Sequence, residues 1–165
     1  VIGDDIQNPV GEGKIINFED QVNQPFGVFD LSPTYKQVKK VHRGFKLLSH
    51  NQILIRDEVE FDGTSNAVRW GMMTDANIEL QDDKVLLTKN GKKFLLQAYS
   101  NQPVTFQVKE AKAYHKEAKD NSGKRLIYVM LNEGRNQETV ELSIVMGDNL
   151  NGLSEVIINS KLAMW

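Results

Sequence analysis

The sequence predicts an all-β chain, an antiparallel β-sandwich of jelly-roll-like type that forms a single domain over residues 1–165. Apolar residues recur at every second position in many short runs, as they do in strands with one buried face. Turns built from Gly, Asn, Asp and Pro separate these runs at short intervals. Many short alternating strands at this spacing, without a convincing amphipathic helix, are typical of sandwiches and jelly rolls.

The expected strands follow one another along most of the chain. Residues 104–109 show the cleanest alternation, because Val104, Phe106 and Val108 point to one face and their neighbours to the other. The other expected strands lie at residues 14–18, 26–31, 40–48, 52–60, 67–75, 77–80, 84–88, 93–99, 125–131 and 139–146. Asn90-Gly91 is the strongest hairpin signal, because both central residues of a type I′ turn need a positive φ.

Two segments are less regular. Residues 109–124 are charged and rich in helix formers, so a short helix and an exposed loop both fit. The loop is favoured, because no apolar stripe would anchor a helix to the core. Residues 147–165 are expected to form a final strand with a tail, or part of a contact with a missing region. The chain ends on apolar residues, which favours a piece excised from a longer protein.

Composition excludes several classes of protein. The chain has 165 residues and a formal net charge of -2, so a dedicated nucleic-acid binder with a strongly basic face is not expected. It has no cysteine, which excludes disulfides, thiolate metal sites and cysteine nucleophiles. No apolar run approaches the roughly 20 residues that a membrane span needs, so no membrane partner is expected.

One stretch, residues 30–48, concentrates basic residues. No acidic residue occurs between Asp30 and Asp57. Alternation splits the stretch into two faces. Arg43 lies with Val41 and Phe45 on the apolar face, so it needs either a partner such as Asp57 or Glu58 or a position at the rim of the sandwich. The candidate residues for binding a polyanion are the lysines and the histidine around it: Lys39, Lys40, His42 and Lys46.

The remaining residues with reactive side chains have structural interpretations. His42, His50 and His115 lie in three different settings, and His42 has basic neighbours, so no metal site is expected. Tyr35 follows Pro33 in a corner, where a structural hydroxyl that closes a backbone bond is favoured over a catalytic phenol. Trp70 alternates onto an apolar face and is expected in the core.

Acidic residues and phosphate-binding motifs point to no catalytic centre. Asp57 and Glu58 lie on opposite faces of their strand, so they do not form the paired carboxylates of a glycosidase. The sequence contains no G-x-S-x-G elbow, P-loop or G-x-G-x-x-G motif. No catalytic residue can be assigned on this basis.

Several stretches in order resemble the β-sandwich region of heparinase II/III-like polysaccharide lyases. They run from about residue 13 to about residue 109: GKIINFE, FGVFDLSPTY, VKKVHRGFKLL, ILIRDEVE, VRWGMMTDANIEL and VLLTKNGKKFLLQ, with TVELSIVM fitting a later strand. The most specific elements are a D-L-(S/T)-x-x-Y corner, an arginine-glycine strand, a (V/I)-x-D-E-(V/I) strand, a W-x-M-x-T strand and an N-G-K-K hairpin. Tyr35, Arg43 and Trp70 belong to these motifs and are interpreted as structural.

The resemblance implies a larger, multidomain parent enzyme. Such lyases join an α/α toroid to sheet domains and cleave uronic-acid-containing polysaccharides by β-elimination. Their catalytic tyrosine belongs to the toroid, and their catalytic and metal-ligand histidines lie at the front of the sheet region. None of these motifs occurs in residues 1–165, so the chain alone is expected to be inactive. It is expected to bind no cofactor of its own, and any metal of the parent enzyme is expected to be bound outside this chain.

The expected function is therefore that of a non-catalytic support domain, whose partner is the toroid of the same parent chain. The resemblance alone implies a periplasmic or secreted location. The rival interpretation is a free-standing module that binds an acidic glycan through the basic strand, and an adhesin-like structural domain is a third class.

Overall fold

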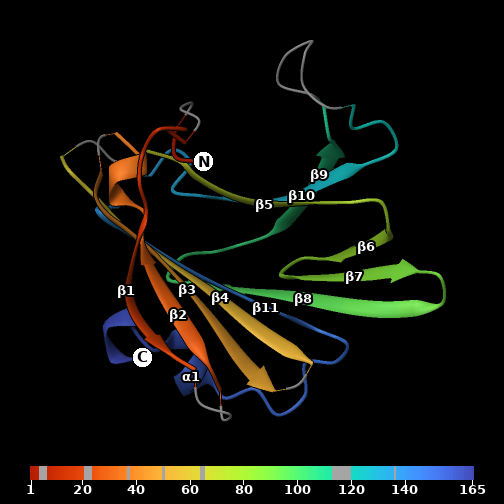
Figure 1. Ribbon diagram of the computed structural model, residues 1–165. Helices are drawn as coiled ribbons and strands as arrows, with labels where there is room; N and C mark the ends of the chain where they lie inside the picture. The colour runs from red at the N-terminus through yellow and green to blue at the C-terminus, as the bar shows by residue number, and fades with distance from the viewer. Residues whose placement is uncertain are drawn as a thin grey trace.

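The chain folds into two antiparallel β-sheets that face each other, and Figure 1 shows the computed structural model. It describes residues 1–3, 7–20, 24–36, 38–49, 51–63, 66–112, 120–135 and 137–165. The large sheet has the strand order β1-β2-β3-β4-β11-β8-β7-β6, and the small sheet has the order β5-β10-β9. The predicted all-β sandwich is thus confirmed.

The strand positions follow the alternating runs of the sequence closely. The strands are β1 (Lys14–Glu19), β2 (Phe26–Asp30), β3 (Val38–Ser49), β4 (Gln52–Phe61), β5 (Val68–Thr74), β6 (Asn77–Gln81), β7 (Lys84–Lys89), β8 (Lys92–Ser100), β9 (Phe106–Glu110), β10 (Arg125–Leu131) and β11 (Thr139–Gly147). The β7–β8 hairpin closes through Asn90 and Gly91 with φ values of 52° and 73°, which confirms the predicted turn. Residues 113–119, within the segment predicted as a loop, lie outside the described residues.

The main core lies between the two sheets. The inner face of the large sheet, which faces the small sheet, contributes alternate residues such as Val59, Ile144 and Leu96, each at most 4% exposed. Trp70 and Ile127 of the small sheet pack against them. Burial of these side chains on both inner faces holds the layers together.

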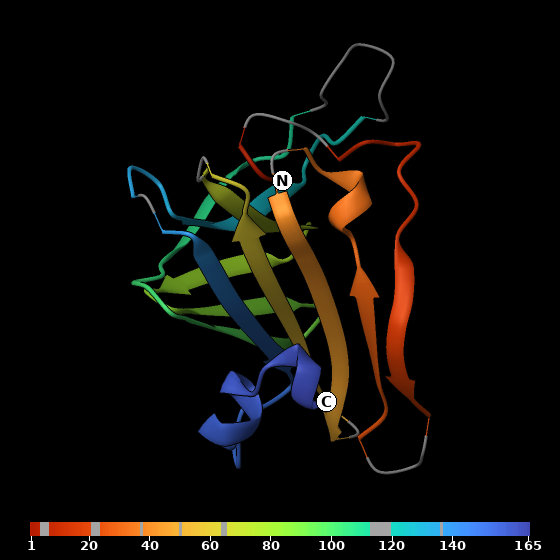
Figure 2. The same ribbon diagram turned by 90° about the vertical axis from the view of Figure 1, so that its left-hand side faces the viewer.

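Part of the outer face of the large sheet is covered by the C-terminal segment, which lies in front of the lower part of the sheet in Figure 2. This segment contains the helix α1 (Glu155–Asn159) and the 3₁₀ turn η2 (Leu162–Met164), and a second 3₁₀ turn, η1 (Ser32–Thr34), precedes β3. Ile158 of α1 packs with Leu54 and Val145 in a second apolar cluster. No described helix is long enough and apolar enough to cross a membrane.

The prediction of a final strand with a tail for residues 147–165 is wrong beyond Gly147. Five helical residues are too few to display a 3.6-residue period, so the sequence pattern does not reveal α1. The helix is held by tertiary packing, because Ile158 is 1% exposed while Val156 on the other side is 79% exposed.

Candidate functional site

Strand β3 carries the candidate binding residues, and its two faces meet different surroundings. Lys40, His42 and Lys46 lie on the outer face of the large sheet, beside the C-terminal segment. Arg43 and Phe45 lie on the inner face. The large sheet thus separates the candidate binding residues Lys40, His42 and Lys46 from Arg43, which is interpreted as structural.

The lysines at the start of β3 are paired with acidic residues of β4. Lys39 Nζ forms an ion pair with Glu60, and Lys40 Nζ lies 3.5 Å from Glu58 Oε2. Lys39 and Glu60 are both exposed enough for water and salt to screen them. These contacts lower the net positive charge that the outer face presents to an acidic ligand.

His42 lies between a lysine and an aspartate. Its Nε2 is 3.8 Å from Asp30 Oδ1. Burial lowers the pKa of His42, Lys40 lowers it further, and Asp30 opposes both effects. The hydrogen bond that the Ser32 hydroxyl donates lowers the pKa of Asp30. The lowered pKa of His42 favours its neutral form, which reduces the positive charge that it adds to the face.

Lys46 is held by aromatic rings rather than by an acid. Its ammonium lies 5.4 Å from the centre of the Phe26 ring and 5.2 Å from that of Trp165. The two rings meet edge to face at 6.0 Å. Lys46 therefore helps to fix the C-terminal residue against β2 and β3.

On the inner face, Arg43 pairs with Asp57, one of the two partners that its position predicts. Arg43 Nε and Nη2 donate hydrogen bonds of 2.6 Å and 2.7 Å to the two carboxylate oxygens. Burial disfavours the charged guanidinium, but the hydrogen bonds and charge of Asp57 prevail and raise the pKa of Arg43. The pair satisfies the arginine within the sandwich.

Tyr35 and Trp70 both contact the main core. Tyr35 is partly buried against the main core, and burial raises the pKa of its phenol. The backbone bond predicted for its hydroxyl is not among the hydrogen bonds of the described residues. Trp70 is 6% exposed within the core. A phenol with a raised pKa is a poor base at neutral pH.

A buried network around Arg56, which the sequence pattern does not reveal, joins the C-terminal segment to the large sheet. The Arg56 side chain is 3% exposed, and its Nη2 donates to Glu141 Oε2 at 2.5 Å. Its Nη1 donates to Ser143 Oγ at 3.0 Å and to the Ile158 carbonyl at 3.4 Å. Glu58 accepts from Arg56 Nε and from the Leu162 N–H. The network satisfies backbone groups of α1 and η2 that packing would otherwise leave unpaired.

The reasoning that assigns a partner to Arg43 reaches only part of this network. Arg56 shares one face of β4 with Leu54 and Glu58. Because that face is partly apolar, the guanidinium of Arg56 needs a hydrogen-bond acceptor. No pattern in the sequence identifies Ser143 or the Ile158 carbonyl as acceptors, because that requires knowing where the C-terminal segment lies.

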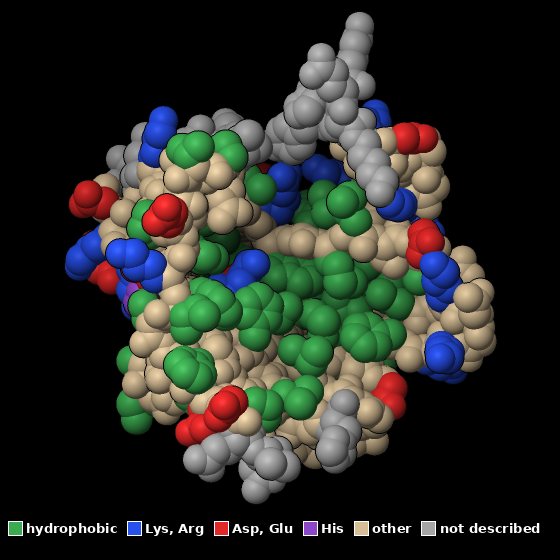
Figure 3. Space-filling view, viewed as in Figure 1, with side chains coloured by type: hydrophobic (Ala, Val, Ile, Leu, Met, Phe, Trp, Pro, Cys, Tyr) green, Lys and Arg blue, Asp and Glu red, His purple; other side chains and the backbone are tan. Residues whose placement is uncertain are grey.

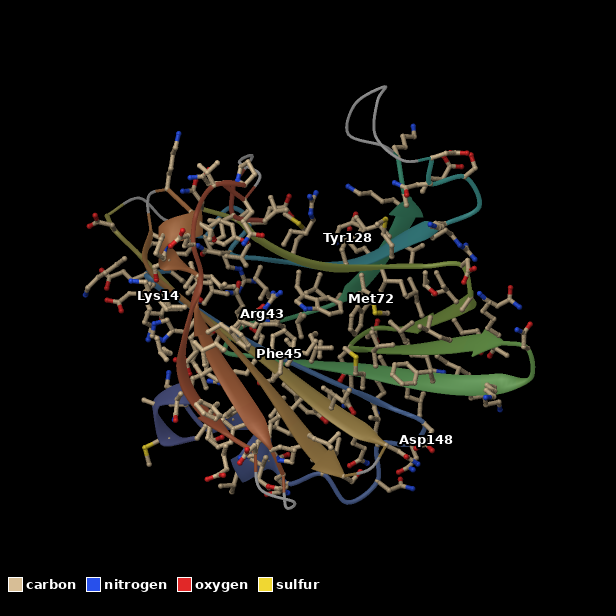
Figure 4. The ribbon with its side chains drawn as sticks, in the orientation of Figure 1. Lys14, Arg43, Phe45, Met72, Tyr128 and Asp148 are labelled. Atoms are coloured by element: carbon tan, nitrogen blue, oxygen red, sulfur yellow. The ribbon has the colours of Figure 1, made fainter. Side chains whose placement is uncertain are left out.

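The inner face of the large sheet is broader than the small sheet that covers it. Figure 3 shows the resulting apolar surface on the open side of the sandwich, and Figure 4 shows Phe45 and Met72 on opposite sides of the opening. Phe45, Ile53 and Phe94 remain 39%, 41% and 38% exposed there. The register of β1 and β2 places Ile15 and Phe18 on the same face.

A shallow pocket lies at the β7–β8 hairpin. Lys89, Lys92 and Lys93 line it together with Phe94 and Asp148. Lys89 Nζ is already engaged with both carboxylate oxygens of Asp75, at 2.6 Å and 2.7 Å. Among the described residues no group of histidine, aspartate and glutamate side chains is arranged to hold a metal ion, and His50 and His115 lie outside those residues.

Comparisons with known proteins identify similar folds. A heparinase III gene product has a TM-score of 0.64 and 18% identity, over 82% of this chain and 21% of that chain. Heparan sulfate lyase HepC from Pedobacter heparinus has a TM-score of 0.65 and 17% identity, over 82% and 21%. A further heparinase III structure has a TM-score of 0.63 and 15% identity, over 87% of this chain and 24% of that chain. No protein-family model and no curated protein matches the sequence.

These identities establish likeness of fold. The predicted resemblance to the sandwich region of heparinase II/III-like lyases is confirmed at that level, and the chain spans about a fifth to a quarter of the length of each similar structure.

Proposed function

We propose that this chain is a non-catalytic β-sandwich support domain of a heparinase II/III-like polysaccharide lyase. The supporting observation is the uneven coverage, because more than four fifths of this chain match about a fifth of the similar lyase chains. The α/α toroid of the same parent is its partner, and the parent is periplasmic or secreted. Any metal of the parent is bound outside this chain.

The reaction of the parent needs groups that converge on one sugar. β-Elimination from a uronic acid requires a base at C5, a cation or amide at the carboxylate and an acid at the leaving oxygen. His42 and Arg43 are adjacent in sequence and therefore lie on opposite faces of β3. Arg43 is already neutralised by Asp57, and Tyr35 has a raised pKa. These residues do not form such a constellation, which favours a supporting role.

An activity assay tests this role. We expect the isolated chain to release no unsaturated uronate from heparan sulfate, heparin or alginate, measured by ultraviolet absorbance of the product. The full parent protein, assayed in parallel on the same substrates, is the positive control. Robust turnover by the isolated chain would show that it contains an active site.

The second candidate is a free-standing module that binds acidic glycans through Lys39, Lys40, His42 and Lys46. Such binding needs lysines that are available to the glycan. Lys39 and Lys40 are already paired with Glu60 and Glu58, and Lys46 already lies against aromatic rings. We therefore expect the chain to elute from immobilised heparin at low salt. Retention to high salt that is lost in a Lys39→Gln, Lys40→Gln double variant would favour the binding module.

A further inference from the structure

The outer edge of β5 has unpaired backbone groups in the described part of the chain. β5 is the first strand of the small sheet, and its other edge pairs with β10 along its whole length. Arg69 N donates to the Val1 carbonyl at 2.8 Å, and Arg69 O accepts from Val1 N at 3.0 Å. In an antiparallel ladder alternate residues point to the same edge, so Gly71 and Met73 present their N–H and C=O groups outward as Arg69 does.

Residues 1–3 define the register that a partner of this edge would follow. Ile2 forms an antiparallel bridge with Val68, and Gly3 N donates to the Ala67 carbonyl at 2.7 Å. Ile2 and Val68 are both 6% exposed and belong to the core. A strand continuing this register pairs with Gly71 and Met73 and turns its alternate side chains inward beside Trp70 and Met72.

The surface beside this edge is apolar. In Figure 1, β5 borders the open side of the sandwich, and Figure 3 shows apolar side chains across that opening. Phe45, Ile53 and Phe94 are each more than a third exposed although they lie on the inner face. A strand added to β5 would widen the small sheet over this face and supply both missing backbone partners and apolar cover.

We propose that a further β-strand, contributed by the remainder of the parent lyase, pairs antiparallel with the free edge of β5 and covers the apolar opening of the sandwich. The inference rests on the proposed function, because a chain that spans about a fifth of the similar structures leaves ample polypeptide to supply the strand. Its side chains opposite Trp70 and Met72 are apolar, and those opposite Gly71 and Met73 face away from the core.

Amide hydrogen exchange, compared between the isolated chain and the full parent protein, tests the pairing. We expect the Gly71 and Met73 N–H groups to exchange about 100-fold more slowly in the parent. The Trp70 and Met72 N–H groups point to β10 and are the internal control, because they are protected in both proteins. Equal exchange of Gly71 and Met73 in the two proteins would overturn the proposal, as would protection that rises with the concentration of the isolated chain, since a second copy would then be the occupant.

A proline variant tests the same pairing by a different route. Met73 is 55% exposed, and its N–H points away from β10, so Met73→Pro removes a donor that the isolated chain does not use. We expect its Tm to match that of the Met73→Val control in the isolated chain. In the parent, Met73→Pro should lower the protection of Gly71 at least tenfold relative to Met73→Val. Equal protection in the two parent variants would contradict the added strand.

The outcome for the strand is distinguishable from the outcome for the function. Exchange of Gly71 and Met73 does not depend on catalysis. A parent that protects these amides without any lyase activity would refute the proposed function and leave the added strand intact.

Discussion

Replacing Arg56 with methionine tests the buried network that holds the C-terminal segment. Methionine preserves much of the apolar volume but removes every hydrogen bond to Glu141, Ser143 and Ile158. Removing one partner of a buried ion pair costs about 3–5 kcal/mol, because it leaves an uncompensated charge. Glu141 retains Lys161 and Glu58 retains Lys40, so the expected loss is at the lower end, about 3 kcal/mol.

The loss should appear as a lower melting temperature. For a domain of this size, about 3 kcal/mol corresponds to a fall in Tm of about 6–12 °C. Calorimetry and urea unfolding of wild type and Arg56→Met measure it directly. The matched control is Lys39→Met, which breaks the exposed pair with Glu60 and should leave Tm unchanged. The reasoning would be refuted if Arg56→Met lowered the free energy of unfolding by less than about 1 kcal/mol, or if both variants lowered it equally.

Two further predictions concern residues on β3. Gly44→Ala should lower stability by about 1–3 kcal/mol, because its Cβ would lie 2.3 Å from Leu162 Cδ2 and 2.7 Å from Trp165 Cζ3. Gly27→Ala is the control, since its nearest contact is 3.3 Å, and an equal effect on Tm and tryptophan fluorescence would contradict the packing argument. An NMR titration should place the pKa of His42 below 6.5, because burial and Lys40 prevail over Asp30. The neutral histidine therefore favours the folded state above about pH 6.5, and wild type should lose stability relative to His42→Gln as pH falls below that value. Parallel stability curves for the two proteins, or a pKa above 6.5, would contradict this assignment.

Alternation was sufficient to predict the strands and to limit the expected acidic partners of Arg43 to Asp57 and Glu58. Arg43 lies among apolar residues on a face that the pattern identifies as buried, so an acidic partner on the next strand follows. Alternation does not show what covers each face of β4, because both faces of this strand are packed against other parts of the chain. Leu54 packs under the C-terminal segment, while Val59 lies in the main core.

The charge of the basic strand illustrates a second limit. Its lysines look unpaired in the sequence, since no acidic residue occurs between Asp30 and Asp57. The partners Glu58 and Glu60 come from the neighbouring strand, and register decides which of them meets which lysine. Register depends on bulges, such as the shift between Val38 and Lys40, that side-chain period does not reveal.

The place of β11 in the large sheet has a consequence for biosynthesis. β11 lies between β4 and β8, and the pair Arg56–Glu141 joins residues separated by 85 positions. As the nascent chain leaves the ribosome, β1 to β4 can form a local meander, but the second edge of β4 stays unpaired until β11 has emerged. During that interval β4 is an exposed template for pairing with other chains. Translation that stops before Thr139 should therefore yield aggregates rather than a smaller folded domain.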